Sequence, residues 1–516
     1  MATNKMTGVN GVLLDGDHSV ALSKLERITS AISHRGRFHS HIFTTDHLKE
    51  IDPSSEPNNE SKIIGISILE KEKHSPYLRF HDNTIMVLDS NLPETIPPEI
   101  REGCAEDLNR VTSGGESSLL RILFGTVAVY INEDGLWVFR SVDGTKPVFY
   151  AKEDGIVAFS TERKGLWNAG FVECNRIEPS HTLQVDWNQE ISHSKLIRRY
   201  RNLNLHGCFK SEIIAQLRTS LEKSFDRLRS LNCAVLFSGG IDSSLAAFMA
   251  EKVANDVVLI TAKAEESHDE DAASRAADIL EMKHLEVDLN EEIIWKILPR
   301  IIYSIESTDK MDVEIAIPFF LATLKANEEG YEVVVSGQGP DELFAGYHRY
   351  LKMYDPENPE NLVKEMKADI SSTYKRNIER DELAIANAGG RAFFPYLSTN
   401  FVELGLATPV NYKVSLSDKP SRKRILRELA DSIGLPEELT SARKKATQYS
   451  SGTSDLLIES IRNNVPQLSD LGKSKVSRRV QQVLNDIGLK LGIPSVAPRD
   501  EALNFSINTE GIFTDK

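Results

Sequence analysis

Cysteine is scarce in this chain, and its few copies lie far apart. The 516 residues include four cysteines, and no two of them have the C-x-x-C spacing: Cys104, Cys174, Cys208 and Cys233. This pattern excludes a disulfide-rich scaffold and gives no sign of a zinc site. It is typical of a protein from a reducing compartment.

The sequence also lacks long apolar runs and any excess of positive charge. No segment approaches about 18 continuous apolar residues, and no basic-then-apolar leader opens the chain. Lys and Arg number 61 against 76 Asp and Glu, which gives a net charge of −15. We therefore expect a cytoplasmic protein that binds neither a membrane nor nucleic acid.

The length and the hydrophobic pattern predict a protein of two domains. Short β-like runs with Gly or Asp turns recur up to about residue 195, which predicts antiparallel sheets with few helices. From about residue 210, apolar strands alternate with helical patterns, which predicts a parallel sheet with helices on both faces. The boundaries we expect are a first domain at 1–195, a linker at 196–209, a second domain at 210–465 and a helical, polar extension at 466–516.

The most informative segment is a glycine turn, Ser238-Gly239-Gly240-Ile241-Asp242-Ser243, which follows the apolar run 234–237. Strand, glycine turn and helix N-terminus together make a pyrophosphate cradle, because the backbone can approach an anion and the free N–H groups point at it. The spacing fits neither the Gly-Lys-Ser/Thr phosphate loop nor G-x-G-x-x-G. The alternative is a structural turn in which Ser and Asp only cap the helix.

A second segment, 333–347, repeats this logic. The buried strand 333–335 ends in Ser336-Gly337-Gln338-Gly339-Pro340, and Asp341 follows. In an open α/β sheet, ligands bind beyond the carboxyl ends of the strands, so Asp242 and Asp341 are expected to share one Mg²⁺ on a pyrophosphate. Taken alone, this segment also fits an ordinary turn with acidic capping residues.

Cations follow the two acidic loops. Lys423 and Arg427 lie four residues apart and hence on one face of a helix, and Lys445 ends the basic run 443–445. Cations at these places would neutralise a transferring phosphate. The alternative is a solvated basic helix surface.

The order of these segments resembles that of the asparagine synthetase family, which includes the β-lactam synthetases and the asparagine-synthetase-domain-containing proteins. The family pattern is S-G-G-x-D-S, D-E, S-G-x-G-x-D-E-x-F-x-G-Y, K-x-x-L-R and R-x-K. Its counterparts here are 238–243, 269–270, 336–347, 423–427 and 443–445, within residues 210–455. The resemblance implies an α/β fold of two domains: an N-terminal Ntn-hydrolase-like αββα sandwich and a C-terminal, doubly wound parallel sheet of the ATP-pyrophosphatase type.

The resemblance also implies a mechanism and a set of site residues. A carboxylate substrate, aspartate or an analogue, would attack the α-phosphate of ATP, and ammonia or an amine would then displace AMP. The implied nucleotide-binding residues are Leu236, Ser238, Gly239, Gly240, Asp242, Ser243, Thr261, Ser336 and Gly337, with Leu236 and Thr261 near the adenosine. The implied Mg²⁺ ligands are Asp242 and Asp341, and the implied catalytic residues are Asp341, Glu342, Lys423 and Lys445. A homodimer is compatible with the resemblance.

The first domain resembles the family's glutamine amidotransferase domain but departs from it at the nucleophile. Segments 33–36, 140–150 and 159–162 resemble H-R-G, R-D-x-x-G-x-K-P-L-Y-Y and F-A-S-E. The segment 6–11 resembles M-C-G-I-x-G, with Thr7 in place of the cysteine, and 88–92 replaces the glutamine-binding N-G-E-I-Y-N segment. We expect that the domain keeps its fold and has lost glutaminase activity.

Two departures in the second domain bear on the substrate. Gln338 stands where many asparagine synthetases have Glu, and an amide cannot take a proton from attacking ammonia. In the segment that resembles E-x-R-x-P-F-L-D, the Glu, Arg and Asp positions hold Arg391, Phe393 and Ser398. Three hypotheses stay open: an AMP-forming amide ligase, a pseudoenzyme that binds ATP or a partner without turnover, and a glutamine-hydrolysing asparagine synthetase.

Overall fold

The structure is a computed structural model, and it describes most of the chain. The described residues are 8–15, 18–36, 38–44, 50–51, 62–69, 78–79, 84–92, 110, 123–195, 199–264, 268–416, 421–441, 452–494, 503, 505–507 and 509.

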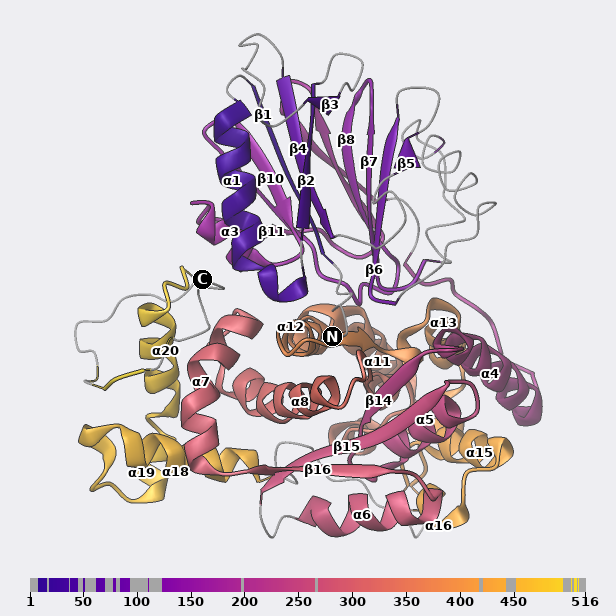
Figure 1. Ribbon diagram of the computed structural model, residues 1–516. Coiled ribbons are helices and arrows are strands. Elements are labelled where there is room, and N and C mark those ends of the chain that lie inside the picture. Colours follow the sequence, from indigo (N-terminus) through magenta and orange to yellow (C-terminus); the bar gives the residue numbers. More distant parts are fainter. Residues whose placement is uncertain are drawn as a thin grey trace.

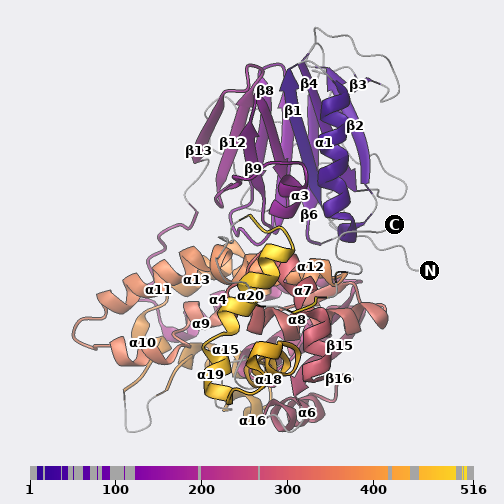
Figure 2. The ribbon, with the colours of Figure 1, turned by 90° about the vertical axis from the view of Figure 1, so that its left-hand side faces the viewer.

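Two antiparallel sheets face each other in the N-terminal domain (Figures 1 and 2). The first has seven strands in the order β11-β9-β10-β1-β4-β2-β3, with bounds β1 (Val9–Asp15), β2 (Phe38–Thr44), β3 (Glu50–Ile51), β4 (Lys62–Leu69), β9 (Phe149–Glu153), β10 (Ile156–Ser160) and β11 (Asn175–Arg176). The second has six strands in the order β13-β12-β8-β7-β6-β5, with bounds β5 (Leu78–Arg79), β6 (Ile85–Ser90), β7 (Thr126–Asn132), β8 (Gly135–Arg140), β12 (His181–Asp186) and β13 (Ile191–Lys195).

Helices cover the outer face of the seven-stranded sheet. Helices α1 (His18–Ala31) and α3 (Arg163–Asn168) pack there through an apolar cluster that includes Leu25 and Leu166. Gly65 of β4 permits this close approach, since an added Cβ would lie 3.1 Å from the Leu25 side chain. These elements form three layers, helix on sheet on sheet. The second helical layer of the expected αββα sandwich is not among the described residues.

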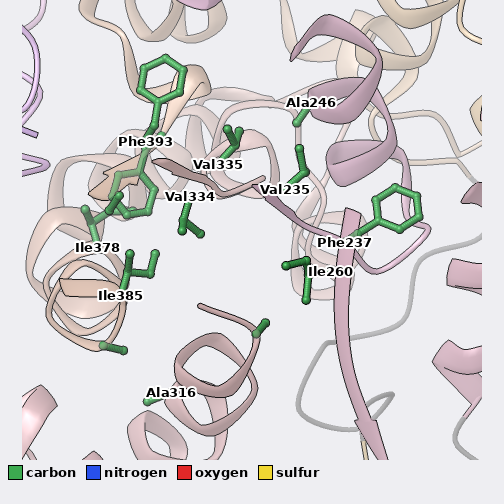
Figure 3. Close-up of a cluster of buried hydrophobic side chains, with 14 of the residues drawn as sticks. Val235, Phe237, Ala246, Ile260, Ala316, Val334, Val335, Ile378, Ile385 and Phe393 are labelled. Carbon is green, nitrogen blue, oxygen red and sulfur yellow. The ribbon is translucent and has the colours of Figure 1, made fainter. Parts of the chain in front are cut away.

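The C-terminal domain contains a five-stranded parallel sheet in the order β16-β15-β14-β17-β18. Its strands are β14 (Asn232–Leu236), β15 (Asp256–Ala264), β16 (His284–Leu289), β17 (Val333–Val335) and β18 (Arg391–Phe393). Figure 3 shows Ala246 of α5 (Ile241–Glu251) on one side of this sheet and Ala316 of α8 (Lys310–Glu328) on the other. Helices thus cover both faces, and the sheet is doubly wound as the alternating pattern predicts.

The remaining helices surround this sheet or extend from it (Figure 1). They are α4 (Lys210–Phe225), α6 (His268–Leu280), α7 (Glu291–Ile305), α9 (Pro340–Leu343), α10 (His348–Met353), α11 (Glu360–Thr373), α12 (Glu379–Asn387), α13 (Thr399–Ala407), α14 (Val410–Lys413), α15 (Arg424–Ile433), α16 (Glu437–Thr440), α18 (Thr453–Asn464), α19 (Lys473–Ser477) and α20 (Val480–Lys490). Among the described residues, no helix combines the length and the apolar character that a membrane span needs.

The strand order places a topological switch point in the middle of the sheet. From β14 the chain proceeds to β15 and β16 on one side, and it then returns to β17 and β18 on the other. Connections that leave β14 and β17 in opposite directions open a crevice at their carboxyl ends, which is where open α/β sheets bind ligands. Both glycine loops of the sequence analysis begin at these two strand ends.

Ion pairs between arginines and buried glutamates join the two domains. Arg35 lies in the 3₁₀ turn η1 (Ser33–Arg35) and donates two hydrogen bonds of 2.9 and 2.8 Å to Glu382 of α12, and it also pairs with Glu162 of its own domain. Arg163 and Arg176 both pair with Glu379, the first residue of α12. The first turn of α12 is therefore held by three arginines of the N-terminal domain.

Candidate active site

The first glycine loop has the geometry that the strand-turn-helix pattern predicts. Gly239 has a φ of +69°, and an added Cβ would lie 2.4 Å from the Ala272 carbonyl oxygen, so only glycine fits. The hydroxyl of Ser243 accepts a hydrogen bond from the Ser238 N–H at 3.2 Å and donates to the Gly240 carbonyl at 3.1 Å. The loop is tight and opens directly into the N-terminus of α5, where backbone N–H groups favour an anion.

The second glycine loop lies against the first. Ser336 is buried at the end of β17, and an added Cβ on Gly337 would come within 3.3 Å of the Ser243 nitrogen. Gly339 has a φ of +112° and turns the chain into α9, whose first turn carries Asp341. The two loops predicted from sequence thus meet at the switch point.

Lys423 joins the two loop aspartates. Its ammonium pairs with Asp242 and lies 2.7 Å from Asp341 Oδ1, and its side chain is only 2% exposed. Burial lowers the pKa of Lys423, and the Asp242 carboxylate opposes this shift. Gly346 leaves room for the Asp341 carboxylate, since a Cβ added at position 346 would lie 1.8 Å from Asp341 Oδ1. Two carboxylates from separate loops therefore converge on one cation.

The donor set at this point fits Mg²⁺ only together with a phosphate ligand. Among the described residues, no three His, Cys, Asp or Glu side chains gather as they would in an all-protein metal site. Asp242 and Asp341 supply two carboxylates, and Mg²⁺ commonly uses one or two carboxylates with substrate phosphates and water.

Leu236 and Thr261, which the resemblance places near the adenosine, lie on neighbouring strands: Leu236 ends β14, and Thr261 lies inside β15. The Thr261 hydroxyl donates to the Phe237 carbonyl at 2.7 Å and lies 2.8 Å from His284 Nε2. Burial lowers the pKa of His284. Leu236 is half-buried where β14 ends. The Thr261 hydroxyl thus joins β15 to Phe237, the residue that precedes the first glycine loop.

Glu342 follows Asp341 but has different partners. It is buried and accepts hydrogen bonds from the Tyr347 hydroxyl at 2.7 Å and the Asn377 amide at 3.1 Å. Burial raises the pKa of Glu342. Through these contacts Glu342 supports the second loop. Its catalytic role stays a prediction.

Several predicted residues lie where the structure gives no side-chain description. Thr7 and Lys445 lie outside the described residues. Asp269 and Glu270 lie on α6, whose backbone is described there, and their side chains are not.

Sequence reasoning missed two residues that support the loops. Tyr396 is buried in the turn η6 (Pro395–Leu397), and its hydroxyl donates to the Asp242 carbonyl at 2.8 Å. Asp381 of α12 accepts a hydrogen bond of 2.8 Å from the Gln338 amide. The sequence holds a signal for Asp381, the charge run Glu379-Arg380-Asp381-Glu382 within an otherwise apolar helix, but it does not show which loop the run faces.

In the N-terminal domain, the segment that replaces the glutamine-binding motif is engaged internally. Asp89 pairs with Lys146 at 2.9 Å, and both side chains are almost fully buried. Burial lowers the pKa of Lys146 to about 8, and Asp89 opposes this shift. Asn91 is also buried, and its N–H donates to the Gly125 carbonyl.

A doubly wound parallel sheet with two aspartate-bearing glycine loops at its switch point places this domain in the α/β class. The family model described as asparagine synthase matches residues 216–360 and 352–484, which together cover more than half of the chain. The chain therefore belongs to the asparagine synthase family.

Similar curated proteins carry related names. A Methanocaldococcus jannaschii protein named among the glutamine-hydrolysing asparagine synthetases is 30% identical over 361 residues, which is 61% of this chain and 66% of that protein. An asparagine synthetase domain-containing protein of Saccharomyces cerevisiae is 28% identical over 46% of this chain and 51% of its own length. Human asparagine synthetase is 25% identical over 66% of each chain. The chain thus spans between about half and two thirds of these relatives.

Similar solved structures include a glutamine phosphoribosylpyrophosphate amidotransferase of Bacillus subtilis, with a TM-score of 0.29 and 12% identity over 81% of this chain and 98% of the other. An ammonia-dependent NAD synthetase of Campylobacter jejuni has a TM-score of 0.25 and 16% identity, over 57% of this chain and 99% of the other.

Proposed function

We propose that this protein is an ATP-dependent, AMP-forming amide ligase that activates a carboxylate as its adenylate. The observation that carries the proposal is the convergence of Asp242 and Asp341 on Lys423 at the switch point. A site for adenylyl transfer from ATP needs a glycine cradle, carboxylates for a metal and a cation for the leaving pyrophosphate. All three occur together at the switch point of the sheet, in a chain that belongs to the asparagine synthase family.

Each loop residue has a distinct task in this proposal. The backbone of Ser238, Gly239 and Gly240, with the Ser243 hydroxyl, holds the phosphates, while Ser336 and Gly337 close the site from the second loop. Bound Mg²⁺, held by Asp242 and Asp341, would supply charge neutralisation to the phosphates. Lys423 lies between the carboxylates in this structure and would stabilise negative charge on the departing pyrophosphate. Leu236 and Thr261 would contact the adenosine.

The role of Lys445 and the choice of acid rest on the resemblance rather than on contacts. Lys445 would stabilise charge on the α-phosphate. Glu342, which accepts hydrogen bonds from Tyr347 and Asn377, would keep the second loop in its reactive shape. Aspartate is the first acid to test, although Arg391, Phe393 and Ser398 depart from the family pattern. The proposal places the reaction in the cytoplasm, with small molecules as its partners.

The proposal also assigns the nitrogen source. Thr7 stands where the family pattern has cysteine. In the segment 88–92, Asp89 pairs with Lys146, and the Asn91 N–H donates to the Gly125 carbonyl. We infer that ammonia or an amine, rather than glutamine, supplies the nitrogen, and that the N-terminal domain has a structural task.

ATP–pyrophosphate exchange tests the proposed activity. The purified full-length chain, with ATP, Mg²⁺ and labelled pyrophosphate, is supplied with one acid at a time from a panel that begins with aspartate. We expect exchange that depends on one acid class, and product formation with ammonium but not with glutamine. Folded protein that shows no exchange with any acid would contradict the ligase and favour a nucleotide-binding pseudoenzyme.

A further inference from the structure

The Gln338 side chain begins at the junction of the two glycine loops. Its neighbours in the chain are Gly337, which packs against the backbone of Ser243, and Gly339, which turns the chain into α9. Gln338 itself is half-buried, whereas Ser336 and Gly339 are buried. The amide is therefore attached at the place where a bound phosphate and a reacting carboxylate would meet.

Asp381 determines which end of the Gln338 amide is directed away from it. Gln338 Nε2 lies 2.8 Å from Asp381 Oδ2, and a carboxylate only accepts hydrogen bonds. The amide oxygen, Oε1, is consequently the end that Asp381 does not hold. Asp381 is fully buried, so water does not compete with Gln338 for the Asp381 carboxylate.

Asp381 is fixed from behind by charged neighbours. Arg380 Nε donates to Asp381 Oδ1 at 2.7 Å, and Arg380 Nη2 lies 2.7 Å from the same oxygen. The Arg380 guanidinium also lies 3.4 Å from Asp312 of α8. Asp312 in turn accepts a hydrogen bond from the Ser307 hydroxyl at 3.0 Å. A carboxylate with this set of partners has little freedom to rotate.

The N-terminal domain holds α12 on both sides of Asp381. Glu379 accepts from Arg176 at 2.7 and 2.9 Å and from Arg163 at 2.5 Å, and Glu382 accepts from Arg35 at 2.9 and 2.8 Å. Because Glu379 and Glu382 flank Asp381 within one helical turn, the domain interface sets the position of the Asp381 carboxylate.

We propose that Asp381 is a positioning residue, which turns Gln338 Oε1 toward the attacking nitrogen, and that the N-terminal domain fixes Asp381 through Glu379 and Glu382. This inference rests on the proposed ligase function. In the step concerned, the nitrogen lone pair forms the C–N bond, and the C–O bond to AMP breaks with its electron pair on AMP. The proton that the nitrogen sheds goes to the AMP phosphate. Gln338 accepts a hydrogen bond from the nucleophile and takes no proton, which suits an amide.

The substitution Asp381→Asn tests the role of Asp381. Asparagine offers a donor as well as an acceptor, so the Gln338 amide is no longer forced into one orientation. We expect ATP–pyrophosphate exchange with the active acid to stay within about 3-fold of wild type, while kcat for amide formation with ammonium falls about 10- to 100-fold. Glu382→Gln should produce the same split to a smaller extent, and Asp486→Asn, which alters a buried aspartate of α20, should leave both rates unchanged.

Two results would overturn the inference. One is an equal loss of exchange and amide formation in Asp381→Asn, since that indicates a structural role only, and the other is no loss in either rate. If Asp381→Asn does not fold, Gln338→Met at the half-buried loop position removes the acceptor without burying a charge, and unchanged amide formation there overturns the inference. Absence of exchange in wild type would instead contradict the proposed function itself.

Discussion

Replacing Asp341 by Asn should reduce ATP–pyrophosphate exchange by at least about 100-fold. The substitution keeps the size of the side chain and removes one of the two carboxylates that converge on Lys423. On the proposed function it would remove a ligand for Mg²⁺, and it leaves the buried ammonium with Asp242 as its remaining partner from these two loops. Exchange rates at saturating ATP, with the acid that supports exchange in wild type, measure the effect.

A matched control for Asp341→Asn is Asp256→Asn. Asp256 is the first residue of β15, at the amino ends of the parallel strands, and it accepts a hydrogen bond of 2.7 Å from the Tyr331 hydroxyl. The chemical change is the same as in Asp341→Asn, but Asp256 lies at the end of the sheet opposite to the two glycine loops. Exchange in Asp256→Asn should match wild type. Equal losses in both variants would show that the effect of Asp341→Asn comes from the fold and not from the site.

Replacing Arg35 by Met should cost about 3–5 kcal/mol of unfolding free energy, because it leaves two buried carboxylates without their shared arginine. Arg35 is 1% exposed and pairs with Glu162 and Glu382, which are also buried. Burial opposes the charge of Arg35, but these two carboxylates outweigh it and raise the pKa of Arg35. Denaturant unfolding at pH 7 measures the loss, and the exposed pair of Arg229 with Asp226 provides the control, since Arg229→Met should cost no more than about 0.5 kcal/mol.

The destabilisation in Arg35→Met should depend on pH. Burial raises the pKa of Glu162, but Arg35, His34 and Lys164 outweigh it and hold the pKa well below its ordinary value of 4.5. Glu162 thus adds stability above pH 4.5, and this stability is lost as the pH falls through the lower, folded-state value. Removal of Arg35 takes away part of that contribution, so the difference between variant and wild type should shrink below pH 4.5. If Arg35→Met lost no more unfolding free energy at pH 7 than Arg229→Met, the result would contradict the account of the domain interface.

The sequence predicted the C-terminal sheet well because local patterns determine it. The runs 234–237, 257–261 and 333–336 are apolar and short, glycine turns follow two of them, and helical spacing separates them, so a parallel sheet with both loops at its carboxyl ends follows from general rules. The strands β16 and β18 and the order of the five strands were not predicted. The meeting of Asp242 with Asp341 follows from the same rules. The family resemblance then supplied Lys423, which no local pattern distinguishes from a surface lysine.

Contacts between distant segments were the part that could not be predicted. Helix α1 was missed because its apolar positions lie among strand-like runs, and its packing depends on Gly65 of a later strand. The pairing of Gln338 with Asp381 joins residues 43 positions apart, and Arg35 with Glu382 joins residues 347 apart. A charge run on a helix looks like a solvated face until the tertiary fold buries it. The altered residue at 338 was visible from sequence, whereas its partner was not.

Transfer of ¹⁸O tests the central claim, carboxylate adenylation, most directly. The acid that supports exchange is labelled in its carboxylate with ¹⁸O and incubated with the full-length protein, ATP, Mg²⁺ and ammonium. Because a carboxylate oxygen attacks the α-phosphate and leaves with it, we predict AMP that carries one ¹⁸O, detected by its mass. Product formation with unlabelled AMP, or with ADP as the nucleotide product, would contradict this account of the site.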